Sequence, residues 1–149
     1  MIALACDHGG FELMKNVKEY LDSAGYEYKD FGTFSTESCD YPVFAALAAS
    51  AIANGICDRG IFICSTGIGI SIAGNKAPGI RAAVCTNTYM AEMTRSHNDA
   101  NVLALGALVT DTESAIDIVV VFLSTDFSGL EKHRRRVAML NDLDKKRKD

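Results

Sequence analysis

The chain has 149 residues, of which 48% are hydrophobic and 23% charged, with 12 glycines and 2 prolines. This length is typical of a single domain, and the apolar content is high enough to offset the entropy of ordering, which excludes a disordered or collagen-like protein. The net charge of −4 disfavours nucleic-acid binding, so we expect no nucleic-acid partner.

Two further features bear on the compartment in which the protein works. The longest apolar runs, at 43–49 and 118–123, fall well short of the roughly 18–20 residues that span a bilayer, and 1–6 is too short for a signal peptide. The five cysteines are scattered and form no C-x-x-C pair, which disfavours a disulfide framework or structural zinc. We therefore expect one cytoplasmic domain over 1–149, with reduced thiols, no metal and no membrane partner.

Hydrophobic periodicity predicts strands and helices that alternate along the chain. Strands are expected over 1–6, 26–31, 60–64, 80–85 and 101–105. Helices are expected over 13–24, 42–53, about 68–75, 88–95, 115–123 and 130–143. The helix over 115–123 is preceded by Thr110 and Glu113 at the spacing of a capping box. Residues from about 144 to 149 are expected to form a frayed basic tail.

Strands that alternate with helices, several of them apolar throughout, predict an α/β protein. We expect a Rossmann-like three-layer α/β/α fold with a five-stranded parallel sheet and an extra C-terminal helix. The extra helix has no following strand and is expected to pack across a neighbouring subunit. It lies in a basic segment, 131–149, that carries eight Lys or Arg residues against four acidic ones. Ligands of such sheets bind beyond the carboxyl ends of the strands.

The strongest local signal is the sequence CSTGIG at 64–69, a glycine-rich turn between a predicted strand and a predicted helix. Backbone N–H groups in such a turn bind anions, and a thiol placed there becomes a usable base or nucleophile. The dinucleotide-binding, P-loop and C-x5-R phosphatase patterns all fail on this segment. Taken alone, a buried Cys64 beside a tight turn is an equally good interpretation.

Several polar residues flank other predicted strand ends. Asp7 and His8 follow the first strand, and the sequence His97-Asn98 precedes the fifth, so we expect both pairs near the cleft that contains Cys64. Each pair also has a simpler interpretation, a helix cap for the first and a hydrogen-bonded turn for the second.

Lys132 and Arg136 are four residues apart on the last predicted helix and so share one face. They are either a phosphate clamp or part of a solvated charge run, and Tyr41 by itself would be a packing residue. We expect all these residues to converge at one end of the sheet. A thiol, histidines, an amide-lined turn and basic residues together favour metal-free proton transfer beside a carbonyl of a phosphorylated small molecule.

The chain resembles the type B ribose-5-phosphate isomerases, a family that also contains the galactose-6-phosphate isomerase subunits. The likeness covers nearly the whole chain and is carried by 5–10 (ACDHGG), 30–33 (DFGT), 40–42 (DYP), 63–81 (ICSTGIGISIAGNKAPGIR), 96–102 (SHNDANV) and 132–137 (KHRRRV). The segment 63–81 is the most specific of these.

The resemblance implies a homodimer, or a tetramer, with active sites between subunits and with no cofactor. It implies that Cys64 is the base that moves a proton between C1 and C2 of the sugar. Thr66 and His97 would help to open the furanose ring, with His97 as the proton donor. The residues implied to bind the sugar phosphate are Asp7, His8, Tyr41, Ser65, Gly67, Ile68, Gly69, Asn98, Lys132 and Arg136.

Three departures from the family pattern bear on the substrate: Ser65 replaces a usual glycine, and Leu108 and Lys132 each replace a usual arginine. The first hypothesis is a metal-independent aldose–ketose isomerase of the pentose phosphate pathway, acting on ribose 5-phosphate and ribulose 5-phosphate through an enediolate. One alternative is an isomerase of another sugar, either a hexose 6-phosphate such as allose or galactose 6-phosphate, or an unphosphorylated aldose. The other is a non-catalytic sugar-phosphate-binding module, which would have no need of a thiol base.

Overall fold

The computed structural model describes residues 1–145. They form β1 (Ile2–Cys6), α1 (Phe11–Ser23), β2 (Tyr28–Asp30), α2 (Tyr41–Ala53), β3 (Arg59–Cys64), α3 (Ile68–Gly74), β4 (Ala82–Val84), α4 (Thr88–Asn98), β5 (Val102–Gly106), α5 (Thr112–Ser124) and α6 (Glu131–Lys145). The five strands pair in parallel in the order β2-β1-β3-β5-β4. The predicted five-stranded parallel α/β fold is confirmed.

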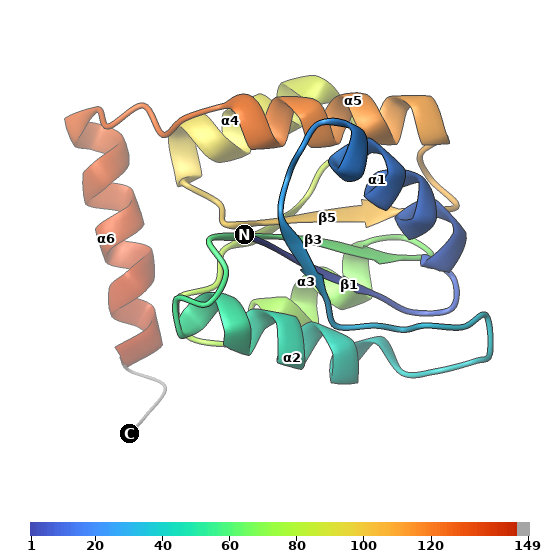
Figure 1. Ribbon diagram of the computed structural model, residues 1–149. Coiled ribbons are helices and arrows are strands. Elements are labelled where there is room, and N and C mark those ends of the chain that lie inside the picture. Colours follow the sequence, from blue (N-terminus) through green and yellow to red (C-terminus); the bar gives the residue numbers. More distant parts are fainter. Residues whose placement is uncertain (146–149) are drawn as a thin grey trace.

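Helices cover both faces of the sheet, which gives three layers (Figure 1). The helices α1, α4 and α5 cover one face, and α2 and α3 cover the other. Because successive side chains of a strand point to opposite faces, β3 contributes Ile61 and Ile63 to one apolar cluster and Phe62 and Cys64 to the other. Burial on both sides explains why the central strands are apolar throughout.

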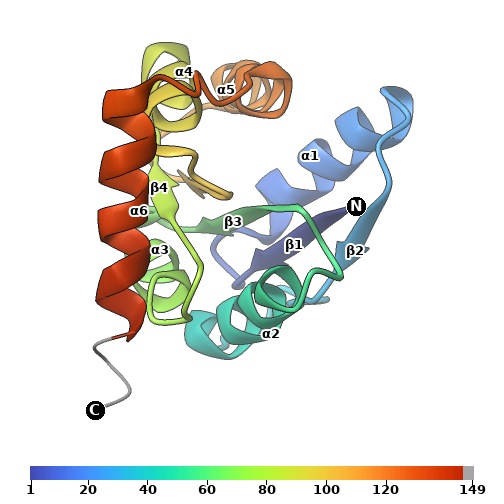
Figure 2. The same ribbon diagram turned by 90° about the vertical axis from the view of Figure 1, so that its left-hand side faces the viewer.

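The last helix, α6, stands outside the three layers, beside β4 where the strands begin (Figures 1 and 2). Its buried residues are His133 and Val137. Two hydrogen bonds join its later turns to the chain before β4, from the Gly79 amide to Asp144 at 2.8 Å and from Arg81 to Asn141 at 3.1 Å. None of the helices within residues 1–145 is both long and apolar enough to cross a membrane.

Several element boundaries differ from the predictions by a few residues, including those of the last three helices. The helix α4 continues past its predicted end to Asn98, so His97 and Asn98 belong to its last turn. The N-cap of α5 is Asp111, which accepts a hydrogen bond from the Ser114 amide at 2.9 Å, so the predicted capping box from Thr110 is wrong. The helix α6 extends to Lys145, and the remainder of the predicted tail, 146–149, lies outside the described residues.

Candidate active site

Cys64 is the last residue of β3 and lies at the carboxyl-terminal edge of the sheet, with 4% of its surface exposed. The chain then turns through Gly67, whose φ of 78° favours glycine, and enters α3. The Gly67 amide donates a hydrogen bond to the Cys64 sulfur at 3.1 Å. This hydrogen bond fixes the sulfur at the carboxyl-terminal edge of the sheet, where a cysteine can act as a base or nucleophile.

The end of β5 holds this turn in place. The amides of Ala107 and Leu108 donate to the carbonyl oxygens of Cys64 and Ser65, both at 2.9 Å. Gly106 makes the close approach possible, since a Cβ there would lie 2.5 Å from the backbone of the turn. The thiol is therefore positioned by backbone contacts between two neighbouring strands.

The side chain of Ser65 lies against Gly9 in the turn that follows β1. A Cβ on Gly9 would overlap the Ser65 hydroxyl oxygen, so the space that glycine leaves open is occupied by the serine side chain. The departure from glycine at position 65 is thus accommodated by a glycine of the neighbouring loop.

Asp7 and His8 lie at the same edge, beyond the end of β1. Asp7 is buried, and its carboxylate accepts a hydrogen bond from the Gly10 amide at 3.0 Å. His8 is exposed, and its Nδ1 accepts a hydrogen bond from the Cys39 amide at 3.2 Å, with the Cys39 sulfur 3.9 Å away. Because Nδ1 acts as an acceptor, the neutral ring carries its proton on Nε2.

Cys39 is a neighbour of this site that the sequence analysis missed. It is 31 residues from His8 along the chain, and only the folded loop before α2 brings the two together.

Tyr41 opens α2 and places its phenol over the turn that contains Cys64. A Cβ on Gly69 would lie 2.7 Å from the Tyr41 hydroxyl oxygen, so glycine makes room for the ring. The Thr66 hydroxyl accepts a hydrogen bond from the Ile68 amide at 3.3 Å. The structure therefore gathers one group of candidate residues, which we call the thiol half: Asp7, His8, Tyr41, Cys64, Ser65, Thr66, Gly67, Ile68 and Gly69.

His97 and Asn98 lie at the opposite edge of the sheet. The helix α4 ends just before β5, and residues that precede a parallel strand lie at its amino-terminal edge. The pairing of β3 with β5 runs from Gly60 and Val102 to Cys64 and Gly106. That length of strand corresponds to roughly 13 Å along the sheet. The prediction that these residues converge with Cys64 at one end of the sheet is wrong for a single chain.

Lys132 and Arg136 are exposed on the first turns of α6, next to the end of α4. The contact between these helices is made by His97 and His133, whose ring centroids lie 4.3 Å apart. The residues His97, Asn98, Lys132 and Arg136 form a second group at the amino-terminal side, which we call the histidine half.

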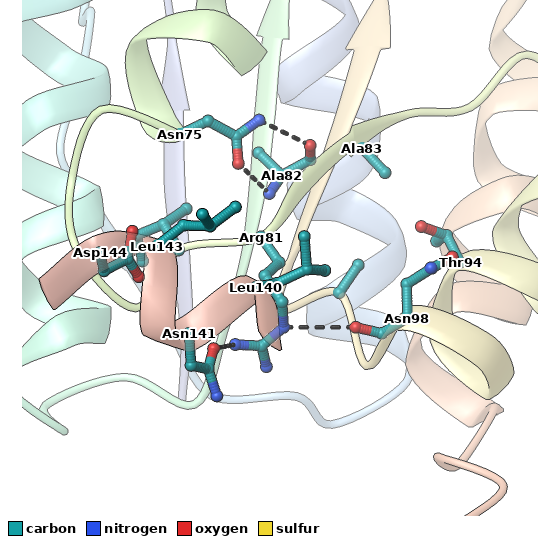
Figure 3. Close-up of a pocket in the computed structure, with 12 residues that line it drawn as sticks. Asn75, Arg81, Ala82, Ala83, Thr94, Asn98, Leu140, Asn141, Leu143 and Asp144 are labelled. Atoms are coloured by element: carbon teal, nitrogen blue, oxygen red, sulfur yellow. Dashed lines mark hydrogen bonds between the residues drawn. The ribbon is translucent and has the colours of Figure 1, made fainter. Parts of the chain in front are cut away.

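A cavity of about 400 Å³ lies between β4, the end of α4 and α6 (Figure 3). Arg81 crosses it, donating to the Asn98 carbonyl oxygen at 3.3 Å and to the Asn141 side chain at 3.1 Å. Apolar side chains of α6, Leu140 and Leu143, complete the lining. The cavity borders the histidine half, and Cys64 is not part of it.

The end of α4 is held rigidly beside this cavity. Asp99 takes a left-handed conformation, with φ of 46°, and its carboxylate contacts Arg95 at 2.9 Å and Arg81 at 3.3 Å. Arg95 is itself buried and also donates to the Ala100 carbonyl oxygen. These bonds fix the last turn of α4 relative to the start of β5.

The fold and the turn at 64–69 define a small Rossmann-like α/β protein with a thiol at its ligand-binding edge. The sequence pattern of the ribose/galactose isomerase family matches residues 2–140. The chain belongs to this family.

Individual members are similar over nearly their whole length. Ribose-5-phosphate isomerase B of Escherichia coli (strain K12) is 45% identical over 98% of this chain and 97% of the relative. The solved structure of Clostridium thermocellum ribose-5-phosphate isomerase B is 52% identical and superposes with a TM-score of 0.96, covering 98% of both chains. That of the Thermotoga maritima ribose 5-phosphate isomerase is 46% identical with a TM-score of 0.91, covering 95% of this chain and 97% of the other.

Proposed function

We propose that this protein is a sugar-phosphate isomerase that interconverts ribose 5-phosphate and ribulose 5-phosphate without a metal or cofactor. The observation that carries the proposal is the Cys64 thiol on its amide-lined turn, in a chain of the ribose/galactose isomerase family. Relatives named as ribose-5-phosphate isomerases match over almost their full length, which supports a pentose phosphate as substrate. The five cysteines are free thiols, in keeping with a cytoplasmic enzyme of the pentose phosphate pathway.

The Cys64 thiolate acts as the base in the isomerisation. It removes the proton from C2 of the open-chain aldose, and the electron pair of that bond forms the C1–C2 double bond of an enediolate with its charge on O1. Return of the proton from sulfur to C1, with transfer of the O2 proton to O1, gives the 2-ketose. Backbone amides of the turn stabilise the developing charge, the role of an oxyanion hole.

Ring opening must precede this step because the aldose phosphate is mainly a closed furanose. His97 donates a proton to the ring oxygen as the bond between C1 and that oxygen breaks. The C1 hydroxyl releases its proton to solvent as the carbonyl forms, and the Thr66 hydroxyl assists. Lys132 and Arg136 hold the phosphate dianion by charge-assisted hydrogen bonds. Asp7, His8, Tyr41 and Asn98 bind the sugar hydroxyls.

These roles need a homodimer, because the thiol half and the histidine half lie at opposite edges of one sheet. In a two-fold dimer, the thiol half of one copy meets the histidine half of the other, and both sites are completed at once. Exposed apolar side chains border each half: Ile68 and Ile72 beside Cys64, and Met139, Leu140 and Leu143 on α6. Such surfaces are typical of protein interfaces, and a second copy would cover both.

A second candidate substrate is another sugar, either a hexose 6-phosphate or an unphosphorylated aldose. The observation that favours it is Leu108, whose side chain is 82% exposed beside the turn that contains Cys64 and offers no charge to a phosphate. The family's own description names galactose beside ribose.

The decisive experiment combines conversion with hydrogen exchange. Purified protein is incubated in D2O with ribulose 5-phosphate, and deuterium at C1 and formation of ribose 5-phosphate are followed by NMR. Both should occur, and Cys64→Ala should lose both. A panel of hexose 6-phosphates and free aldoses identifies a different sugar substrate. If no sugar exchanges a carbon-bound proton while sugar phosphates still bind, the protein is a binding module.

A further inference from the structure

The rings of His97 and His133 form a contact that the proposed reaction does not yet use. His97 is exposed on the last turn of α4, whereas His133, on α6, is only 4% exposed. Their ring centroids are 4.3 Å apart, and the ring planes are inclined by 36°. Within residues 1–145 no hydrogen bond fixes the His97 ring, so its orientation depends on packing against the ring of His133.

The His133 ring is itself fixed by Ser128, from the segment between α5 and α6. The Ser128 hydroxyl oxygen lies 2.6 Å from His133 Nδ1 and accepts a hydrogen bond from the Leu130 amide at 3.3 Å. The hydroxyl can donate to Nδ1 or accept from it, according to the tautomer of the ring, and either hydrogen bond fixes the ring.

The same segment is tied to α4 immediately before His97. The Ser128 amide donates to the carbonyl oxygen of Ser96 at 3.0 Å. Ser128 therefore fixes both the backbone next to His97 and the ring that packs against it.

The surroundings of His133 favour its neutral form. Desolvation is the main cause that lowers the pKa of His133, and His97 from α4 and Lys132 and Arg136 from α6 lower it further. Ser128, from the segment between α5 and α6, also contacts the His133 ring and is uncharged. A neutral ring avoids the repulsion that two protonated imidazoles in contact would suffer.

We propose that His133 is a positioning residue which, fixed by Ser128, holds the exposed ring of His97 in the orientation needed for proton transfer to the sugar ring. The inference rests on the proposed isomerase function, because it deepens the role of His97 in that reaction. His133 does not contact the sugar and does not take the proton that His97 donates. It supplies a packed surface for His97, in the way that supporting residues orient a catalytic group.

The test separates ring chemistry from proton transfer at carbon. Ribulose 5-phosphate has no ring, so deuterium exchange at C1 reports Cys64 alone, whereas conversion to ribose 5-phosphate also requires ring closure. His97→Asn and His133→Ala should both lower conversion more than exchange, by about 10–100-fold for His133→Ala, as expected for a displaced catalytic group. Ser128→Ala should lower conversion by about 10-fold, the loss of one hydrogen bond.

His133→Phe retains an aromatic ring in the core and should recover part of the conversion lost in His133→Ala. It also keeps the proposal testable if the alanine variant fails to fold. Ser124→Ala is the matched control, because this hydroxyl bonds to carbonyl oxygens of its own helix, α5. It should leave the ratio of conversion to exchange unchanged.

An NMR titration gives a readout that does not depend on activity. The chain contains only three histidines, and His8, in the thiol half, serves as an internal reference. The His97 ring protons should be shifted upfield by the adjacent ring, should move downfield in His133→Ala and should stay upfield in His133→Phe. Unchanged His97 shifts, or an unchanged ratio of conversion to exchange in an active His133→Ala, would overturn the inference. A wild-type protein inactive on every sugar would instead refute the proposed function.

Discussion

Cys64 and His97 are attached to opposite edges of one sheet, Cys64 at the carboxyl end of β3 and His97 just before the amino end of β5. If both act on one sugar, they must come from different chains. The separation also makes the assembly testable by activity alone.

Two inactive variants should therefore restore activity when their subunits are mixed. A hybrid of Cys64→Ala and His97→Asn has one site in which both residues are intact and one in which both are altered. Random reassociation after mild unfolding should recover about a quarter of wild-type activity, because half of the dimers are hybrids with one working site.

The matched control mixes Cys64→Ala with Thr66→Ala, which lie in the same half of the site. Every hybrid site then carries one substitution, and the mixture should show no more than the residual activities of its components. The absence of recovery with His97→Asn would place the site within one chain. Recovery in the control would contradict the placement of Cys64 and Thr66 in the same half of the site.

Replacement of Cys64 by alanine should abolish isomerisation while the fold survives. General bases contribute about 10²–10⁴-fold to rate, so the loss should be at least about 100-fold. The stability cost should be about 1 kcal/mol, since the Gly67 amide loses its acceptor. Cys57→Ala is the control, as both cysteines are buried in the same apolar cluster. Near-normal turnover in Cys64→Ala would make the thiol structural.

Leu108→Arg should strengthen phosphate binding. The Leu108 side chain is 82% exposed, and its amide is bonded to Ser65 in the turn that contains Cys64, so an arginine would reach the site without disturbing the core. A charged hydrogen bond is worth roughly 1.5–3 kcal/mol, so KM for ribose 5-phosphate should fall about 10–100-fold. Because the contact is made equally in ground and transition states, kcat should change little.

Leu108→Gln, similar in size but uncharged, should leave KM unchanged. A KM that stays constant or rises in Leu108→Arg would mean that the phosphate binds elsewhere or that the natural substrate lacks one.

The buried thiols should make the protein less stable at high pH. Burial, with a smaller contribution from Asp30, raises the pKa of Cys6 to about 12, and burial raises that of Cys85 to about 11, from an ordinary value of 9.0. Above pH 9 these thiols ionise in the unfolded chain but not in the folded one, so stability falls from pH 9 through 11–12. The urea midpoint measured from pH 7 to 11 should show this decline.

The combined variant Cys6→Ala, Cys85→Ala is the control. Its urea midpoint should be lower at pH 7 but should fall less steeply as the pH rises.

At pH 8, an alkylating agent should modify the partly exposed Cys39 of native protein before Cys6 or Cys85, as read by mass spectrometry. Early modification of Cys6 in folded protein would contradict the burial argument.

Most of the fold could be predicted from local patterns in the sequence. Alternating strands and helices, the apolar run that became β3, and the turn at 64–69 depend on residues within a few positions of one another, so periodicity and turn chemistry predict them. Element ends were less well predicted. Asp111, and not Thr110, caps α5, and α4 continues to Asn98.

The sequence by itself placed Asp7, His8 and Cys64 together, because residues at the ends of parallel strands share the carboxyl edge of the sheet. The direction of β5 also implies that His97, which precedes this strand, lies at the amino-terminal edge. The expectation that His97 lies near Cys64 overlooked this consequence. Only the tertiary structure decided that Ser65 fits against Gly9, that Cys39 reaches His8 and that His133 packs against His97. These pairs are far apart along the chain, and their contacts depend on packing between elements, which local periodicity does not encode.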